Sequence, residues 1–155
     1  MAELKKSIGF RWEHLRKPLG MDLSSASDEH EDRAYHLIAC LKAAREETLV
    51  GTGRLHINEH NEAQIRYLAV AEDSRRQGIG RRLVRALEER AQQLNHHQVV
   101  VNVRSHALPF YEALGYQIVG GPFDKLGGIE HYKMSTTLAE AGTDNKAARQ
   151  LSAQT

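Results

Sequence analysis

The stretch of this sequence best suited to chemistry is a turn rich in glycine and arginine at residues 72–81, which reads EDSRRQGIGR. It follows the apolar run RYLAV and precedes a helical pattern. Gly78 and Gly80 let the backbone approach a ligand closely, and the first N–H groups of a helix point toward that ligand. Neighbouring arginines form charge-assisted hydrogen bonds with phosphate oxygens. The turn therefore predicts a pyrophosphate site, with a purely structural tight turn as the alternative.

Two familiar phosphate loops do not account for this turn. A Walker A loop ends in Gly-Lys-Ser or Gly-Lys-Thr, and neither is present. A Rossmann fingerprint needs a third glycine, where this chain has Leu83. The turn must belong to another strand-to-helix architecture.

Positive charge gathers beside the turn. The chain has 21 Lys+Arg and 20 Asp+Glu, a net charge of +1, but residues 75–90 hold six arginines against two glutamates. A local cationic cluster on a nearly neutral protein favours a small anionic ligand over a long nucleic acid. Aromatic residues are only 6% of the chain and do not alternate with the basic ones, as stacking on bases would require. We expect no nucleic-acid partner, and a solvated arginine-rich helix face is the simpler alternative.

The elements that must position the turn follow from hydrophobic periodicity. The predicted strands cover residues 35–41, 48–57, 63–70, 98–103, 116–119 and 131–138. The predicted helices cover residues 8–17, 79–94 and 107–114. Residues 20–32 are polar and aperiodic, and they predict a mobile loop. A second loop is predicted at 120–128.

This order of elements predicts an α+β fold, with one mixed and mostly antiparallel sheet flanked by helices. The crossover from 63–70 through the long helix to 98–103 should be right-handed. A length of 155 residues, 41% of them hydrophobic and 26% charged, suits a single domain. We assign residues 1–138 to this domain and residues 139–155 to a polar C-terminal tail.

Composition also bears on location and cofactors. No apolar run approaches 18 residues, and the polar start does not resemble a secretory signal, so we expect no membrane partner. The single cysteine, Cys40, cannot form an internal disulfide, which favours a reduced, cytoplasmic protein; in its apolar strand it suits the core. The nine histidines lack Cys-x-x-Cys or His-Glu-x-x-His spacing, so no metal is expected.

Three motifs together resemble the GCN5-related N-acetyltransferase (GNAT) superfamily. They are YLAV at 67–70, Arg-x-x-Gly-x-Gly at 75–80 and FYEALGY at 110–116. The resemblance covers about residues 8–138. Within the superfamily, FRWEHLRKPLG, NEAQIRYLAV and GIEH are most similar to the acetyltransferase half of bacterial proteins fused to a hot-dog thioesterase domain. No thioesterase domain is present here, so a function of that half cannot be transferred.

The resemblance implies acetyl-coenzyme A as co-substrate. The pyrophosphate would lie on the turn, contacted by Arg75, Arg76, Gln77, Gly78, Ile79, Gly80 and Arg81. The pantetheine would pair with the backbone of Leu68, Ala69 and Val70, and the Val70 N–H would donate to the thioester carbonyl as charge develops on its oxygen.

Tyr111 stands where the family places the acid that protonates the leaving thiolate, since a phenol can donate a proton as charge builds on sulfur. The alternative is an aromatic residue of the core. Ala107 and Phe110 would pack the helix or touch the cofactor.

The acceptor side is less defined. Many members carry a glutamate where this chain has Arg66, which could recognise a carboxylate or phosphate on the substrate, or be paired with Glu62 or Glu130. An amine acceptor needs a base, and His131, His56, Glu62 and Glu130 are the candidates. We therefore expect an acetyl-coenzyme A-dependent N-acetyltransferase that acts on an unidentified amine, with a non-catalytic coenzyme A-binding module as the alternative.

The start of the chain departs from the family. Members open with a strand before the first helix, whereas residues 1–7 are polar and lead directly into a helical pattern. The first strand is therefore predicted to be missing or replaced. An exposed sheet edge would result, to be covered by the tail or by a second subunit in a homodimer.

Overall fold

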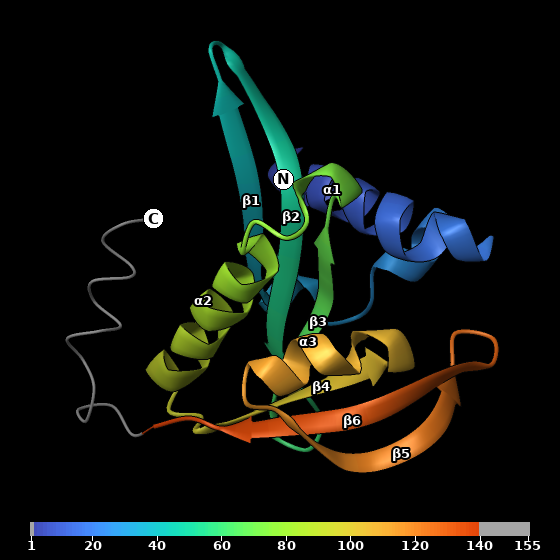
Figure 1. The fold of residues 1–155 in the computed structure, drawn as a ribbon, viewed down its shortest axis with the longest axis vertical. Helices are drawn as coiled ribbons and strands as arrows, with labels where there is room; N and C mark the ends of the chain where they lie inside the picture. The colour runs from blue at the N-terminus through green and yellow to red at the C-terminus, as the bar shows by residue number, and fades with distance from the viewer. Residues whose placement is uncertain (1, 140–155) are drawn as a thin grey trace.

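The computed structural model describes residues 2–139, which form one six-stranded sheet with helices on both faces (Figure 1). The helices are α1 (Ala2–Arg11), α2 (Ile79–Gln93) and α3 (Leu108–Ala113). The strands are β1 (Tyr35–Ala43), β2 (Glu46–Ile57), β3 (Ala63–Val70), β4 (Gln98–Arg104), β5 (Gln117–Lys125) and β6 (Ile129–Thr137). Their order across the sheet is β1-β2-β3-β4-β6-β5. Only β3 and β4 pair in parallel, so the predicted α+β fold with a mixed, mostly antiparallel sheet is confirmed.

The two faces of the sheet differ in chemistry, and strand β2 shows why. Side chains alternate between the faces of a strand. A Cβ added at Gly51 or Gly53 would meet side chains of α2, so from Gly51 onward the odd-numbered positions face that helix. In the same part of β2, Arg54 and His56 point to the opposite face, toward α1 and the segment that follows it. One face is therefore apolar and the other polar, although both are buried.

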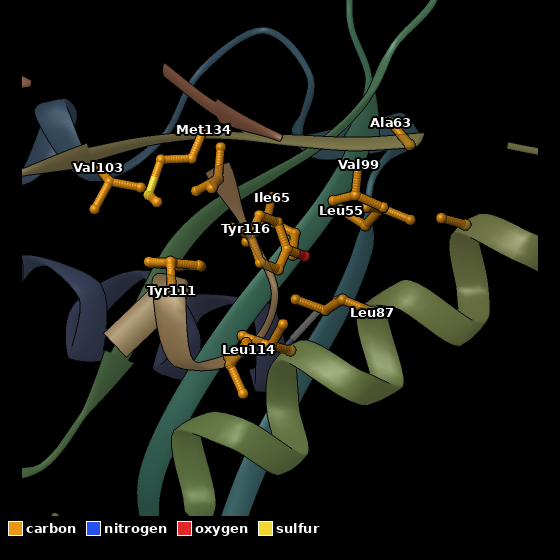
Figure 2. Packing of buried hydrophobic residues seen from close by; sticks show 13 residues of the cluster. Leu55, Ala63, Ile65, Leu87, Val99, Val103, Tyr111, Leu114, Tyr116 and Met134 are labelled. Atoms are coloured by element: carbon orange, nitrogen blue, oxygen red, sulfur yellow. The ribbon is translucent and has the colours of Figure 1, made fainter. Parts of the chain in front are cut away.

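The hydrophobic core lies on the face covered by α2 and α3. Leu87 of α2 packs with Leu55, Ile65 and Val99 of the sheet, and all four side chains are almost fully buried. Figure 2 shows these side chains meeting Tyr111, Leu114 and Tyr116, which come from α3 and the turn after it. Burial of large apolar side chains contributes roughly 1.5–3 kcal/mol each. This core therefore fixes α3 against the sheet.

The opposite face holds a network of ion pairs. Arg54, whose side chain is fully buried, donates to Asp28 at 2.7 Å and to Glu31 at 2.6 Å. Arg11 of α1 donates to Glu31 at 2.9 Å, and Arg66 of β3 donates to Asp28 at 2.6 Å. The prediction of a mobile loop at 20–32 is therefore wrong. Its carboxylates neutralise arginines of the sheet and of α1, so the segment is bound to the fold.

A bulge interrupts β3 at its centre. Gly53 of β2 lies opposite two residues, Tyr67 and Leu68, because the register shifts between Thr52 and Arg54. Tyr67 adopts a φ of +56°, which L residues rarely adopt. Beyond the bulge β3 separates from β4, since their parallel pairing covers only Ala63–Ile65 and Val99–Val101. The sheet therefore opens between these two strands.

Several predicted boundaries need correction. α1 begins at Ala2 rather than at residue 8, and a π-helical turn, Trp12–Arg16, completes the predicted segment. β5 covers residues 120–125 of the loop predicted at 120–128, because it pairs with β6 across two register shifts, and only 126–128 form a turn. Cys40 is partly exposed on β1 rather than in the core. No helix among residues 2–139 has the length and apolarity to cross a membrane. The predicted tail, after Ala139, lies outside the described residues.

Candidate active site

The glycine and arginine turn leads from β3 into α2 with its charged side chains in solvent. Gly78 has a φ of +80° and stands at the start of α2, where no side chain caps the first N–H groups. Gly80 allows close packing, since a Cβ there would lie 3.2 Å from the Phe110 ring. Arg75 and Arg76 are exposed, and the Arg75 Nε donates to the Val70 carbonyl at 3.2 Å. Free helix N–H groups and exposed guanidiniums are the donors that a pyrophosphate requires.

Not all of the arginines predicted around the turn are free for a ligand. Arg85 pairs with Glu88 at 2.7 Å, and Glu88 also accepts a 2.8 Å hydrogen bond from the buried Tyr116 hydroxyl. Arg90 stacks on the ring of Tyr35. The second half of the arginine-rich helix is therefore structural, and the exposed cations at the start of α2 remain for binding.

A cavity of about 160 Å³ lies where β3 and β4 part. Its walls come from β3, β4, the π-helical turn, α3 and the β5–β6 turn. Its lining includes Leu68, Ala107 and Tyr111 as well as Arg16, Lys125 and His131. Sequence analysis expected Leu68, Ala107, Tyr111, Arg66 and His131 near the reaction, and the structure brings these five to one cavity.

Backbone donors also face the opening. The Ala71 N–H donates to the Val50 carbonyl of β2 at 2.8 Å. Because N–H directions alternate along a strand, those of Leu68 and Val70 point away from β2, toward the gap beside β4. Leu68 lines the cavity, whereas Val70 lies nearer the turn and does not line it. Leu68 therefore shares a cavity with the predicted acid, Tyr111, whereas Val70, whose amide we favoured from the sequence, does not.

Tyr111 is both a core residue and a wall of the cavity. Its side chain is 5% exposed and packs edge-on against Phe110 and Tyr116, with ring centroids 5.0 and 5.3 Å away. Burial raises the pKa of the phenol above its usual value. Tyr111 is therefore a core residue that also lines the cavity, and its hydroxyl stays protonated at physiological pH.

His131 is the candidate base that the structure brings into the cavity. Its ring is buried, and Nδ1 lies 2.8 Å from the Ile129 carbonyl, which can only accept. Nδ1 therefore carries the proton, and Nε2 is left with a lone pair. Burial, and next the charge of Lys125, lower the pKa of the imidazole, although the Ile129 carbonyl opposes this shift.

The other candidate bases do not line the cavity. His56 is buried on the polar face, where it stacks on His30 and accepts from Arg54 at 3.1 Å. Burial and the Arg54 charge lower the pKa of His56 to about 4. Glu62 accepts from Lys133, and Glu130 accepts from Ser105. Arg66 does line the cavity, but it pairs with Asp28 rather than with either glutamate considered from the sequence.

The residues predicted from the sequence do not include three cations of the cavity wall, Arg16, Arg104 and Lys125. They come from three separate elements, and no spacing rule relates them.

Within residues 2–139, Glu29, His30 and Glu59 place ligand atoms close enough for a metal ion, but both glutamates are exposed.

With this geometry in place, comparison with known proteins identifies the class. Residues 2–116 match the model of the acetyltransferase (GNAT) family, which spans well over half of the sequence. The chain belongs to this family, so the resemblance seen in its motifs is confirmed at that level. The uncharacterized N-acetyltransferase YjcF of Bacillus subtilis is 25% identical over 132 residues, which cover 85% of this chain and 91% of that protein.

Solved structures confirm the fold. A putative N-acetyltransferase from Lactobacillus plantarum superposes with a TM-score of 0.77 at 22% identity, covering 89% of this chain and 92% of its own. An aminoglycoside 6'-N-acetyltransferase, solved with coenzyme A, gives a TM-score of 0.71 at 19% identity, covering 92% and 95%. At these identities the similarity establishes the shared architecture.

Proposed function

We propose that this protein is an acetyl-coenzyme A-dependent N-acetyltransferase that transfers the acetyl group directly to an amine. The observation that carries the proposal is the opening between β3 and β4, which has the arginine turn at its head and a cavity lined by Leu68, Tyr111 and His131 at its base. Coenzyme A in the related aminoglycoside enzyme supports the choice of co-substrate.

In this proposal the cofactor is held by its two ends. The pyrophosphate binds the first N–H groups of α2 together with Arg75, Arg76 and Arg81, which are all exposed. The pantetheine follows β3 past Val70 and Ala69, whose edge toward β4 is unpaired. The thioester then reaches the cavity, where Ala107 and Tyr111 meet it.

The chemical step needs three groups around the thioester. The amine nitrogen forms a bond to the carbonyl carbon, and the Leu68 N–H donates to the oxygen as it gains negative charge. The carbon–sulfur bond then breaks, and the Tyr111 hydroxyl gives its proton to the departing thiolate. The His131 Nε2 accepts the proton that the amine loses.

Calorimetry with acetyl-coenzyme A tests the binding step. We expect saturable binding by the native protein and none by an Arg76→Glu, Gly78→Asp variant, which places two negative charges in the turn. Arg45→Glu, Gly20→Asp is a matched control, because Gly20 shares the left-handed φ and also has open space around its Cβ. Failure of the native protein to bind, or equal loss in both variants, contradicts the proposal.

A non-catalytic coenzyme A-binding module is the second candidate. One observation favours it: within the described residues no carboxylate lines the cavity, so His131 is the single candidate base among those foreseen. Release of free thiol from acetyl-coenzyme A in the presence of an amine decides between the two. An enzyme releases thiol in proportion to the amine acetylated, and a module does not.

Three finer expectations from the sequence remain predictions: the similarity to the fusion proteins, the cytoplasmic location and the homodimer. The outer strand β5 supports the homodimer, because its Ile118 and Val119 side chains are 46% and 58% exposed. A monomeric mass at high concentration would contradict the homodimer.

A further inference from the structure

The cavity wall is unusual in its charge. Four cationic side chains line it, Arg16, Arg66, Arg104 and Lys125, together with His106 and His131. Within residues 2–139 no aspartate or glutamate lines it. The molecule has nearly equal numbers of acidic and basic residues. The cavity is therefore strongly electropositive in a protein that is close to neutral.

Three of these cations have no carboxylate partner among the described residues. Arg66 is neutralised by Asp28 at 2.6 Å. Arg16, which is 4% exposed, donates only to the carbonyls of Ser25 and Leu15. Arg104 donates to the Leu15 carbonyl at 2.9 Å. Lys125 is half-buried and makes no ion pair in this part of the chain.

Burying these unpaired cations costs free energy unless an anion binds beside them. A charge removed from water needs a counter-charge, and one left alone typically costs several kcal/mol. The pKa values of the cavity cations reflect that cost. Burial lowers the pKa of both Arg16 and Arg104. Burial, and next the charges of Arg66 and Arg16, lower the pKa of Lys125 to about 8, although Asp28 opposes the shift.

Acetyl-coenzyme A does not supply the missing charge. Its phosphates belong to the turn at 75–81, and none of those residues lines the cavity. The part that would enter the cavity is a thioester, which is neutral. The three cations are therefore left for the second substrate.

We infer that the acceptor is a small amine that also carries an oxyanion, a carboxylate or a phosphate, which Arg16, Arg104 and Lys125 bind. This inference rests on the proposed acetyl transfer and names its substrate class. The volume favours a small acceptor, because about 160 Å³ corresponds to roughly five water molecules and the cavity must also admit the thioester. Polyamines and other polycations are disfavoured by like-charge repulsion.

Matched amine pairs test the inference. O-Phosphorylethanolamine is compared with ethanolamine, and L-alanine with L-alaninamide, so that each pair differs in the anionic group. With the full-length protein saturated with coenzyme A, we expect millimolar concentrations of an anionic member to raise the melting temperature, and its neutral partner not to. The two pairs separate a phosphate acceptor from a carboxylate acceptor. In thiol-release assays the anionic member should give a kcat/KM at least about tenfold higher.

Variants of the cavity cations show which side chains produce the preference for an anionic amine. Arg104→Gln and Lys125→Gln should each lose most of the preference, and Arg16 is avoided because it is buried in the fold. Lys133→Gln is the control, since Lys133 pairs with Glu62 and does not line the cavity. Equal effects of anionic and neutral amines, no stabilisation by either anionic amine, or a preference that survives both variants overturns the inference. Acetyl-coenzyme A binding is measured separately, and its absence would instead reject the proposed function.

Discussion

Buried and half-buried arginines occur in two regions of the molecule, the polar face of the sheet and the cavity between β3 and β4, and the two groups behave in opposite ways. On the polar face, Arg11 and Arg54 are fully buried and paired with Asp28 and Glu31. In the cavity, Arg16 and Arg104 donate to backbone carbonyls and pair with no carboxylate among the described residues. An arginine side chain therefore stabilises the fold where a carboxylate of the chain pairs with it. Where no carboxylate pairs with it, the guanidinium remains available to a ligand. The predictions below separate these two roles.

Removing Asp28 should give the largest effect. Asp28→Ala leaves Arg54 with Glu31 alone and Arg66 with no carboxylate among the described residues, and loss of one partner of a buried pair costs about 3–5 kcal/mol. Urea unfolding measures this loss. Asp32→Ala, an exposed neighbour, should stay within about 0.5 kcal/mol. A similar small change for both variants would show that the network does not stabilise the fold.

The same network should weaken in acid. Arg54 and the His30 backbone N–H, followed by Arg66, hold the pKa of Asp28 well below its usual value against the opposing effect of burial. A group whose pKa is depressed on folding contributes stability above its unfolded pKa and loses it as the pH falls further. The native protein should therefore lose stability below about pH 4. Asp28→Ala should show a flatter dependence in the same unfolding experiment.

The acid role proposed for Tyr111 in the cavity is tested by removing its hydroxyl. Tyr111→Phe keeps the ring in the core but removes the proton donor, so kcat should fall by roughly 10²-fold or more with acetyl-coenzyme A affinity unchanged. Tyr116→Phe is the matched control, because its hydroxyl binds Glu88 and does not line the cavity. It should lower stability and leave turnover near the native value. Turnover unchanged in Tyr111→Phe would remove this residue from the acid role.

His131 should have a smaller effect than Tyr111, since other routes can deprotonate part of the amine. His131→Gln should lower kcat by about 10- to 100-fold. Because the pKa of His131 is lowered, the acid limb of the native pH profile should lie below about pH 6.5. A profile without such a limb, or one that the variant shares, would argue against His131 as the base.

Lys125 should give the smallest change, visible above neutral pH. Its pKa of about 8 means that its charge is present below that pH and is lost above it. Arg16, Arg66 and Asp28 are the charged groups that set this value. The kcat/KM for an anionic amine should fall several-fold between pH 7 and 9. Lys125→Arg should flatten this fall, because a guanidinium stays charged.

The sequence predicted the parts of this molecule that depend on local patterns. The turn at Gly78 and Gly80 and the apolar face of α2 follow from spacing along one segment, and the resemblance to the GNAT motifs pointed to Tyr111. The ion pairs of Asp28 and the cavity cations join residues that are tens of positions apart, such as Arg104 and Leu15. Polar residues at 20–32 looked solvated because their arginine partners lie on β2, β3 and α1, which periodicity alone does not relate.

The left-handed φ of Tyr67 has a consequence for how a ligand enters. A non-glycine residue in this conformation costs roughly 1–2 kcal/mol. Four guanidinium groups surround the ring, with carbons 4.5 to 5.4 Å from its centroid, and cation–π attraction offsets that cost. The bulge is thus stabilised by contacts within the chain, and we expect the gap beside it to need no induced rearrangement. Ligand association should therefore be rapid, and little of the binding free energy should be needed to open the gap between β3 and β4.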